Sequence, residues 1–441
     1  MKKSNTRSLF LFAALLLFSM MLLVGCSKNS PEKGKEKEKF DPDALPESVG
    51  LAYQVNEDEK TCTITGIGTC TDTQIVIPKE INGYIVTEIG VQAFKDCESI
   101  TDLAMPDSVT KISYEAFLHC SKLKSLVLSN SLYDVAPDAF VLCDKLATTT
   151  HQKIVYLGSR DNPYLYAKGA NAREITAANL HESTKLIGGY AFQYCEELTS
   201  VTIPNGVTRI GAHAFDGCKA LTEITIPDSV IGIDGLAFAY CEALTNVTLP
   251  NSIEGIGYGA FGECPNIVGT VYQNAKYLGN SQNPYFYLLQ AVDQSITSVV
   301  VHEDTVFLEY NAFRNCTQLT SVTIPNSISY FAGTFKNCTS LTSITIPESV
   351  TQIFGATFEN CTALTSVVIP NSVTEIDEYA FLECENLATV YYGGTLEEWE
   401  RIVVLENHIL DSHPTCYFYS STQPTVSGNY WRYVDGIPTA W

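Results

Sequence analysis

The stretch LTSVTIPNGVTRIGAHAFDGC, residues 198–218, decides the fold of this 441-residue chain. Val201 and Ile203 alternate with polar neighbours, and this period of two predicts a strand with one buried face. Pro204 ends the strand because proline cannot donate a further ladder hydrogen bond. The first half of the stretch therefore predicts one short strand followed by a corner.

The second half of the stretch returns the chain to its starting side. Asn205-Gly206 is a turn pair, and Val207 and Ile210 point apolar side chains back to the interior. Phe215 fills the core, and Cys218 lies at the corner that leads to the next strand. The stretch is thus one turn of a coil whose strands stack in parallel, about 4.8 Å apart.

The same pattern returns every 22 or 23 residues, each time with a phenylalanine three residues before a cysteine. The marker cysteines are Cys97, Cys120, Cys143, Cys195, Cys218, Cys241, Cys264, Cys316, Cys338, Cys361 and Cys384. A fixed period of this size indicates a solenoid, because each turn buries its apolar face only against its neighbours.

Two intervals between marker cysteines are longer, Cys143–Cys195 and Cys264–Cys316, each spanning 52 residues. Each interval divides into one ordinary turn without its cysteine and one turn lengthened by six residues. Counting back one period from the next cysteine places Ala172 and Asp293 in the cysteine slot. We therefore expect the coil to continue through both intervals.

The two lengthened turns carry matching aromatic residues at 156–164 and 277–285, which are 121 positions apart. A larger unit of 121 residues was therefore duplicated. The pattern predicts a β-rich solenoid of about 14 turns over residues 49–395, including an N-terminal cap, with parallel strands, little helix and two aromatic bulges.

The C-terminal cap and tail comprise residues 396–441. Thr395-Leu-Glu-Glu398 is a capping box that predicts a helix through about Leu405. The apolar face expected for this helix consists of Leu396, Trp399, Ile402 and Val403.

The first 26 residues predict a signal peptide, with a basic start and an apolar run over 9–24. Its end, Leu23-Val24-Gly25-Cys26, resembles the lipobox of bacterial lipoproteins, in which the cysteine thiol carries the lipid. A transmembrane anchor is the alternative, but the run is short of the roughly 20 residues that a span needs. Residues 27–48 are rich in alternating Lys and Glu and predict a charged, flexible linker.

The chain is acidic, with 49 Asp and Glu against 27 Lys and Arg. Only 3 of the acidic residues but 8 of the basic ones precede residue 40, so the remainder holds 46 and 19. This charge repels phosphate backbones and argues against nucleic acid as a partner. It would favour a basic protein ligand or Ca²⁺, although solvation alone also explains it.

The repeat Leu-x-x-Ile/Val-x-Ile-Pro-x-Ser-Val-x-x-Ile-Gly-x-x-Ala-Phe-x-x-Cys resembles the BspA-like class of leucine-rich repeats. The resemblance extends over about residues 60–395, and the ending from Tyr391 to Trp399 is also similar to that family. It implies a β-rich leucine-rich repeat solenoid on a bacterial cell surface. Because some members bind host matrix proteins or other cells, it also implies adhesion, although a solenoid specifies no ligand.

Other residues that could carry chemistry follow the structural period. The cysteines lack the close pairing of zinc ligands, so they are expected to be buried free thiols, with disulfides between neighbouring turns as the alternative. His181 and His302 take the slot usually held by proline and are positional. We expect no catalytic residue, no metal and no cofactor.

The candidate binding residues lie on the outer strand face and in the bulges. They are Thr202, Thr225, Thr248, Thr323 and Thr345 on the strands and Tyr164, Tyr166, Tyr285 and Tyr287 in the bulges. The strand face could be an inert solvated sheet, and the aromatic residues could merely cover an enlarged corner. The function predicted is a non-enzymatic, lipid-anchored surface protein that binds a protein, with a carbohydrate-binding module or a passive envelope spacer as alternatives.

Overall fold

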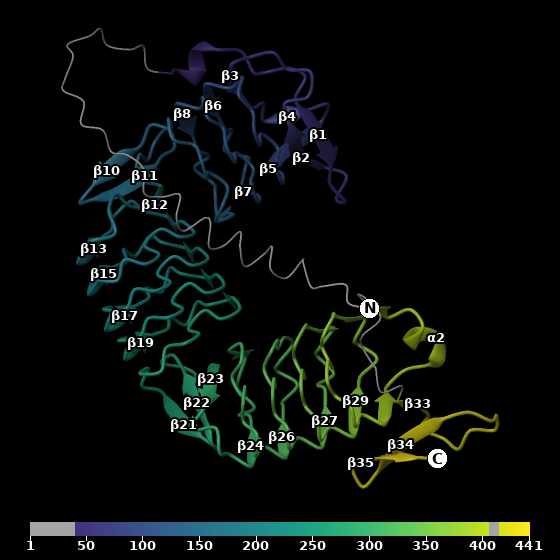
Figure 1. Cartoon of the computed structure of the whole chain (residues 1–441). Coiled ribbons are helices and arrows are strands. Elements are labelled where there is room, and N and C mark those ends of the chain that lie inside the picture. Colours follow the sequence, from purple (N-terminus) through teal and green to yellow (C-terminus); the bar gives the residue numbers. More distant parts are fainter. Residues whose placement is uncertain (1–39, 405–413) are drawn as a thin grey trace, which may run out of the picture. The chain divides into compact units, whose positions relative to one another are not determined.

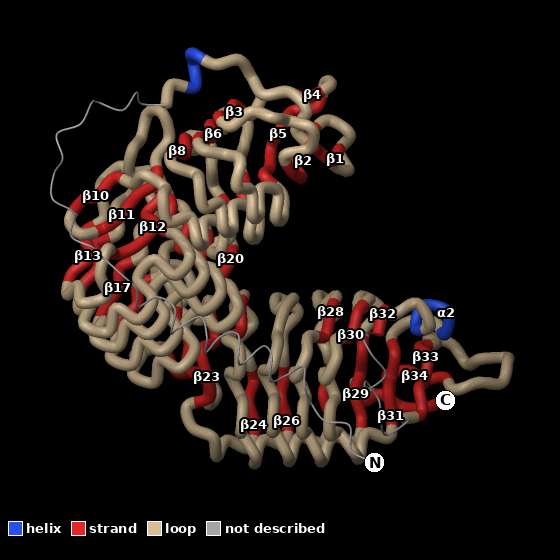
Figure 2. The backbone as a smooth tube through the Cα atoms, turned by 45° about the horizontal axis from the view of Figure 1, so that its top comes forward, coloured by secondary structure: helices blue, strands red, loops and turns tan. Residues whose placement is uncertain are grey.

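The computed structural model describes residues 40–404 and 414–441 (Figure 1). The expected signal peptide, the expected lipidation site Cys26 and most of the expected linker lie outside these residues. Pro42–Trp441 forms one compact unit, so the folded part begins a few residues before the expected residue 49. It is a solenoid of about 15 turns with parallel strands and almost no helix, which confirms the predicted fold class. Short strands alternate with long loops around each turn (Figure 2).

The first of two strand ladders, here called the sheet ladder, contains the alternating strands predicted from the repeat. Its strands are β3 (Gln74–Val76), β6 (Asp102–Ala104), β8 (Ser125–Val127), β13 (Ala177–Asn179), β15 (Ser200–Thr202), β17 (Glu223–Thr225), β19 (Asn246–Thr248), β24 (Ser298–Val300), β26 (Ser321–Thr323), β27 (Ser343–Thr345), β29 (Ser366–Ile369) and β31 (Thr389–Tyr392). Within each pair the register is parallel, for example Val201 opposite Ala178. In strands such as β17 and β27 the central residue is buried and its two neighbours are exposed.

The second ladder closes the other side of each turn. It consists of β5 (Tyr84–Ile89), β7 (Lys111–Ile112), β9 (Asp134–Val135), β14 (Leu186–Ile187), β16 (Arg209–Ile210), β18 (Gly232–Ile233), β20 (Gly255–Ile256), β25 (Phe307–Leu308), β28 (Gln352–Ile353), β30 (Glu375–Ile376) and β32 (Val403–Val404). The N-terminal cap adds η2 (Pro42–Ala44), β1 (Ala52–Val55), β2 (Thr61–Gly66) and β4 (Glu80–Ile81). Both ladders confirm that one repeat is one turn.

The corner that carries the phenylalanine and cysteine has a backbone that the sequence did not predict. In most of these corners two residues that are not glycine are left-handed, for example Tyr190 (φ 59°) and Tyr194 (φ 57°), and elsewhere Gly217, Gly259 and Gly333 take one of the two positions. The N–H groups of these two tyrosines point to the next turn, and between them Phe192 donates to the Ala214 carbonyl at 2.7 Å. The corner is therefore a third ladder, and its hydrogen bonds compensate a conformation that most side chains avoid.

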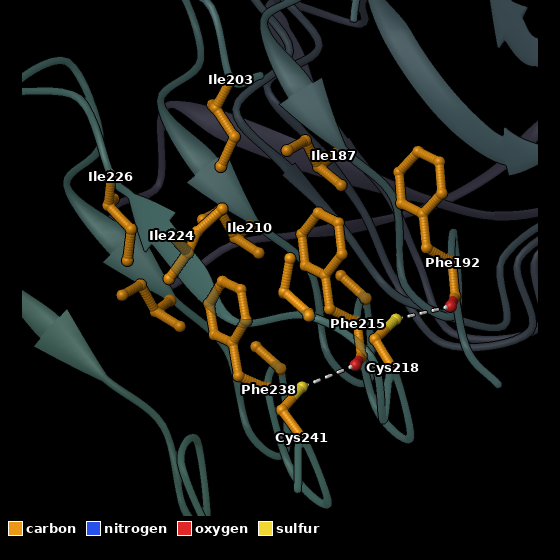
Figure 3. Close-up of a cluster of buried hydrophobic side chains, with 14 of the residues drawn as sticks. Ile187, Phe192, Ile203, Ile210, Phe215, Cys218, Ile224, Ile226, Phe238 and Cys241 are labelled. Carbon is orange, nitrogen blue, oxygen red and sulfur yellow. Dashed lines mark hydrogen bonds between the residues drawn. The ribbon is translucent and has the colours of Figure 1, made fainter. Parts of the chain in front are cut away.

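The cysteine thiols complete this third ladder from inside the core (Figure 3). Cys218 donates to the Phe192 carbonyl at 3.2 Å, and Cys241 donates to the Phe215 carbonyl at 3.3 Å. The phenyl rings stack from turn to turn, with 5.1 Å between the centroids of Phe215 and Phe238. The sulfur and phenyl columns thus run side by side along the interior, as predicted.

The two long intervals contain the expected ordinary turns, because β13 and β24 take their places in the sheet ladder. Ala172 and Asp293 are exposed, so the sulfur column itself is interrupted at these two turns. The thiol is therefore not required for a turn to form.

The two lengthened turns differ from the expected bulges. Each is an antiparallel three-stranded meander (Figure 1). The first consists of β10 (Thr149–His151), β11 (Ile154–Leu157) and β12 (Tyr166–Ala170), and the second of β21 (Thr270–Tyr272), β22 (Ala275–Leu278) and β23 (Tyr287–Ala291). The last strand of each meander then pairs in parallel with the second ladder.

Each meander is an internal wall between two parts of the core. In β23, Tyr287 packs in the cluster on one side, and the next residue, Leu288, packs in the cluster on the other. In β12, Tyr166 and Ala167 divide in the same way. The interior therefore consists of three apolar clusters separated by two walls.

The C-terminal cap extends the sheet ladder by three strands. The capping box of Thr395 and Glu398 is confirmed, but the helix α2 (Leu396–Trp399) ends well before Leu405. It ends because the chain rejoins the second ladder at β32, which pairs with β30. Leu396 is 52% exposed, so the expected apolar face is wrong at that position. The remaining strands are β33 (Thr415–Tyr419), β34 (Tyr430–Val434) and β35 (Ile437–Ala440).

Candidate ligand-binding surface

The outer face of the sheet ladder presents the predicted threonines to solvent. All of the residues Thr202, Thr225, Thr248, Thr323 and Thr345, here called the threonine column, are exposed. They occupy the same outward position of their strands, as the register of Thr225 opposite Thr248 shows. The column consists of two runs, one on β15, β17 and β19 and one on β26 and β27, and the second meander and β24, which has Val300 at this position, lie between them.

The threonine column differs from the threonines just before the strands in the hydrogen bonding of its hydroxyl groups. Thr199 and Thr245, which lie just before strands, donate to backbone carbonyls of the preceding turn at 2.9 and 3.0 Å. Thr320 and Thr365 do the same at 2.9 and 3.0 Å. These four hydroxyls are part of the scaffold and are not available to a ligand.

Within the column, only the Thr202 hydroxyl has a partner in the described part of the chain, the Asn179 side chain at 3.0 Å. The hydroxyls of Thr225, Thr248, Thr323 and Thr345 make no hydrogen bond to any described residue. They retain both donor and acceptor capacity for a ligand.

The bulge tyrosines are less accessible than predicted. Tyr166 is 3% exposed and Tyr287 is 1% exposed, so the expectation that they face a ligand is wrong. They are buried because they end the phenyl stacks: Tyr166 meets Phe140 edge-on, and Tyr287 meets Phe261 edge-on, both at 5.9 Å between centroids.

Tyr164 and Tyr285 remain partly exposed, and each stacks on a histidine. The centroid distance is 3.7 Å from Tyr164 to His181 and 3.8 Å from Tyr285 to His302. Of the four candidate bulge tyrosines, only Tyr164 and Tyr285 are thus partly accessible to a ligand.

The histidines in these stacks are occupied by the backbone. Nδ1 of His181 accepts a hydrogen bond from the Ser183 N–H at 3.1 Å, and the backbone N–H of His181 donates to the Tyr156 hydroxyl at 3.1 Å. His302 repeats both contacts with Asp304 and Tyr277. Among residues 40–404 and 414–441, no group of three or more His, Cys, Asp or Glu side chains is placed to hold a metal ion. The histidines therefore hold the corner that follows each meander.

Most of the marker thiols are buried and hydrogen-bonded to a backbone carbonyl, as in Cys218 and Cys241, whereas Cys97 is only partly buried. Burial raises the pKa of Cys195 and of Cys316 to about 11 and that of Cys384 to about 12. The described cysteines are free thiols. Raised pKa values keep Cys195, Cys316 and Cys384 protonated at neutral pH, where thiols are poor nucleophiles.

One buried carboxylate was not singled out in the sequence. Glu309 is 4% exposed and accepts hydrogen bonds from the Tyr287 hydroxyl at 2.6 Å, the Phe261 N–H at 3.0 Å and the Tyr310 N–H at 2.8 Å. Burial raises its pKa to about 7, against these hydrogen bonds, which lower it. In an ordinary turn the phenylalanine N–H donates to the next turn, as Phe238 does to Ala260. Glu309 replaces that carbonyl where the second meander interrupts the ladder.

The threonine column continues into the C-terminal cap. Thr345 lies opposite Val368, Val368 opposite Tyr391, and Tyr391 opposite Tyr417. The outer face therefore changes from hydroxyl-bearing to aromatic towards the C-terminal end. Tyr417 was not predicted to lie on this face, because the chain beyond residue 395 does not repeat with the period of 23.

Comparison with known families identifies the repeat. The BspA type leucine-rich repeat region matches in 6 copies over residues 69–160, 168–287 and 290–405. The chain therefore belongs to the BspA type leucine-rich repeat family, whose members are typically bacterial cell-surface proteins. A search of curated proteins found no match.

Several solved structures are similar to the chain. A leucine rich cell surface protein from Faecalibacterium prausnitzii is 28% identical, with a TM-score of 0.32, over 81% of this chain and 98% of that one. A leucine-rich repeat protein from Bacteroides ovatus is 23% identical, with a TM-score of 0.34, over 84% and 98%. The pneumococcal vaccine antigen PcpA is 15% identical, with a TM-score of 0.29, over 85% and 93%.

No helix in the described residues is long and apolar enough to span a bilayer.

Proposed function

We propose that this protein is a lipid-anchored bacterial surface protein that binds an extracellular protein through the outer face of its sheet ladder. The observation that carries the proposal is the contrast between hydroxyl columns. The scaffold threonines are hydrogen-bonded to backbone carbonyls, whereas the exposed hydroxyls of Thr225, Thr248, Thr323 and Thr345 have no partner among the described residues. Two pairs of free donors and acceptors, Thr225 with Thr248 and Thr323 with Thr345, each about 4.8 Å apart along the ladder, suit a polypeptide that lies along the coil.

In the proposed function the protein is a binding scaffold and catalyses no reaction. Members of the repeat family are generally non-enzymatic scaffolds. Most of the marker thiols, such as Cys218, and the buried Glu309 side chain are occupied by scaffold hydrogen bonds. Binding through one extended face, without a reactive pocket, is the function that this arrangement supports.

Membrane attachment rests on the N-terminal sequence, where Cys26 follows Leu23-Val24-Gly25. Expression in a bacterium fed an alkyne-labelled fatty acid tests this part. The wild-type chain should carry the label and sediment with membranes, and Cys26→Ser should lose the label. A variant that still sediments unlabelled would indicate a transmembrane anchor instead.

Ligand binding is tested on an array of extracellular-matrix proteins and glycans, followed by interferometry with the protein that binds. Changing the five residues of the threonine column to Val should weaken binding at least about tenfold, since several hydrogen bonds of about 1 kcal/mol each are lost. Matched changes of Thr351, which lies just before β28 of the second ladder, and of Ser329, which takes the same position one turn earlier, should leave binding unchanged. Equal binding by both variants, or no ligand on the array, would count against this face.

A further inference from the structure

The outer face of the C-terminal cap carries a cluster of aromatic side chains, here called the platform. It consists of Tyr391 from β31, Tyr417 and Tyr419 from β33, and Trp431 and Tyr433 from β34. Alternate residues of β33, Cys416 and Phe418, pack against the core, so the tyrosines between them face outward.

The platform is held rigid by its central tryptophan. Trp431 is 1% exposed, and its indole N–H donates to the Tyr392 carbonyl at 2.7 Å. The rings of Tyr419 and Tyr433 stand nearly perpendicular to the indole, at 70° and 74°, with centroids 5.3 and 5.0 Å away. Aromatic side chains fixed in this way lose little conformational freedom when a ligand binds.

The rim of the platform is accessible and acidic. Tyr419 is 43% exposed and Tyr433 is 46% exposed, and the phenol hydroxyls of both make no hydrogen bond to any described residue. Burial, and to a smaller extent the negative charge of Glu348, raises the pKa of Tyr433. Asp435 follows in the turn of the β34–β35 hairpin.

The only cation–π contact within the cap lies away from the platform, among the residues that the structure describes. The Arg432 guanidinium lies 3.9 Å from the centroid of the Trp441 ring. Arg432 alternates with Trp431 and Tyr433 along β34, so it points to the other side of the strand. The platform therefore offers ring faces with negative quadrupoles, and an acidic rim, without a cation of its own.

We propose that the platform binds the Lys and Arg side chains of a basic segment in the extracellular partner. This inference deepens the proposed function and depends on it. The platform continues the line of Thr345 and Val368 in register, so one extended segment can contact both. The acidic charge of the chain, −22 overall, attracts such a segment over longer distances.

The experiment uses the full chain in non-ionic detergent and a synthetic twelve-residue peptide of alternating Arg and Ser. Its control peptide carries citrulline at every Arg, which removes the charge and keeps the shape. The Arg peptide should bind and the citrulline peptide should not. Tyr433→Ala and Tyr419→Ala should each weaken binding about 3- to 30-fold, the range of a cation–π contact. Binding should also weaken as salt increases.

Three further variants separate the proposal from its alternatives. Tyr433→Phe and Tyr419→Phe keep the ring and should bind like wild type, whereas a glycan bound through the phenol hydroxyls would be lost. Tyr114→Ala changes a tyrosine that is 59% exposed elsewhere and should have no effect. Thermal unfolding of each variant shows whether the cap remains folded, and the Phe variants preserve the test if an Ala variant does not fold.

Equal binding of the Arg and citrulline peptides, or full binding by Tyr433→Ala and Tyr419→Ala, would overturn the proposal. If an oligosaccharide binds the wild-type chain and the Phe variants lose that binding, the proposal would be overturned in favour of a glycan ligand. If binding of the matrix protein is lost only when the threonine column is changed, the proposal for the platform would be overturned and the proposed function would stand. Loss of peptide binding only when the platform is changed would support the platform even if the threonine column proves inert.

Discussion

The two copies of the 121-residue unit satisfy the backbone N–H groups beside their meanders in different ways. Each meander interrupts the third ladder and removes the carbonyls that the preceding corner needs. In the second half, Glu309 supplies a carboxylate to the Phe261 N–H and accepts from the Tyr287 hydroxyl. In the first half the equivalent residue is Gly188, where a Cβ would lie 2.4 Å from the Tyr166 hydroxyl oxygen.

Both halves of the unit keep a wall that ends in a buried tyrosine, but the hydrogen-bond partner of the tyrosine hydroxyl differs between them. Tyr166 and Tyr287 are both buried and both end a phenyl stack. The Tyr166 hydroxyl accepts from the Gly189 N–H, whereas the Tyr287 hydroxyl donates to a carboxylate. A residue can therefore change from Gly to Glu at this junction if the tyrosine hydroxyl changes its partner.

The largest expected effect is on the second junction. Glu309→Gly should lower the free energy of unfolding by about 4 kcal/mol, because buried donors lose their acceptor and a cavity forms. Urea denaturation followed by tryptophan fluorescence measures this. Glu309→Gln keeps an acceptor and should lose less than half as much. An equal loss in both variants would show that charge, rather than hydrogen bonding, matters at this site.

The reverse experiment concerns the first junction. Gly188→Ala should cost about 2 kcal/mol, because the new methyl group overlaps the Tyr166 hydroxyl. Tyr166→Phe removes that oxygen and should reduce the cost of the alanine in a double-mutant cycle. If the two changes are additive, the overlap is not the reason that glycine occupies this position.

The pH dependence of stability should also differ between the junctions. The pKa of Glu309 is raised to about 7, above its ordinary value of about 4.5, so the folded state holds a proton that the unfolded state releases. The contribution is fully present below about pH 4.5 and is lost as the pH rises to about 7, by about 3 kcal/mol in all. Melting temperatures at pH 5 and pH 8 should differ less for Glu309→Gln than for wild type. An unchanged difference would assign the dependence to another group.

The smallest expected difference is in the thiols that follow the two walls. Burial raises the pKa of Cys195 and Cys316 to about 11 in both halves. Both should react slowly and equally with iodoacetamide at pH 8, whereas Cys70 and Cys97, which are only partly buried, should react first. Mass spectrometry of tryptic peptides measures the rates. Rapid labelling of either buried thiol would indicate that its turn opens.

The repeat predicted the fold well because each turn carries the same local signals. Proline follows most strands of the sheet ladder, and the period alone located the turns at β13 and β24 that lack a cysteine. The capping box at Thr395 was predicted for the same reason, since both of its residues are close in sequence. The end of helix α2 was not, because β32 returns to the second ladder through contacts distant in sequence.

The meanders were missed because their tight turns lack the usual residues. Gln152 and Lys153 have φ values of 46° and 68° in the first, and Gln273 and Asn274 have values of 45° and 66° in the second. Two-residue hairpins of this kind usually carry Asn-Gly or Asp-Gly. Without that signal, Tyr166 and Tyr287 were assigned to the surface, although both lie in strands that are buried on each side.

The threonine column was located correctly by alternation, but its distinction from the scaffold threonines required the hydrogen bonds. Thr199 and Thr225 are equally exposed side chains near a strand, and only the first is bonded to the backbone. The platform could not be located because β31, β33 and β34 come together across a segment without the repeat.

The internal walls have a consequence for how the coil would come apart. A repeat array without partitions frays from an end, one turn after another, because every turn is supported only by its neighbours. Here an opening that reaches β12 or β23 meets a strand whose other face is still packed. Unfolding that starts at one end of the molecule should therefore stop at the nearest wall and leave the next apolar cluster folded.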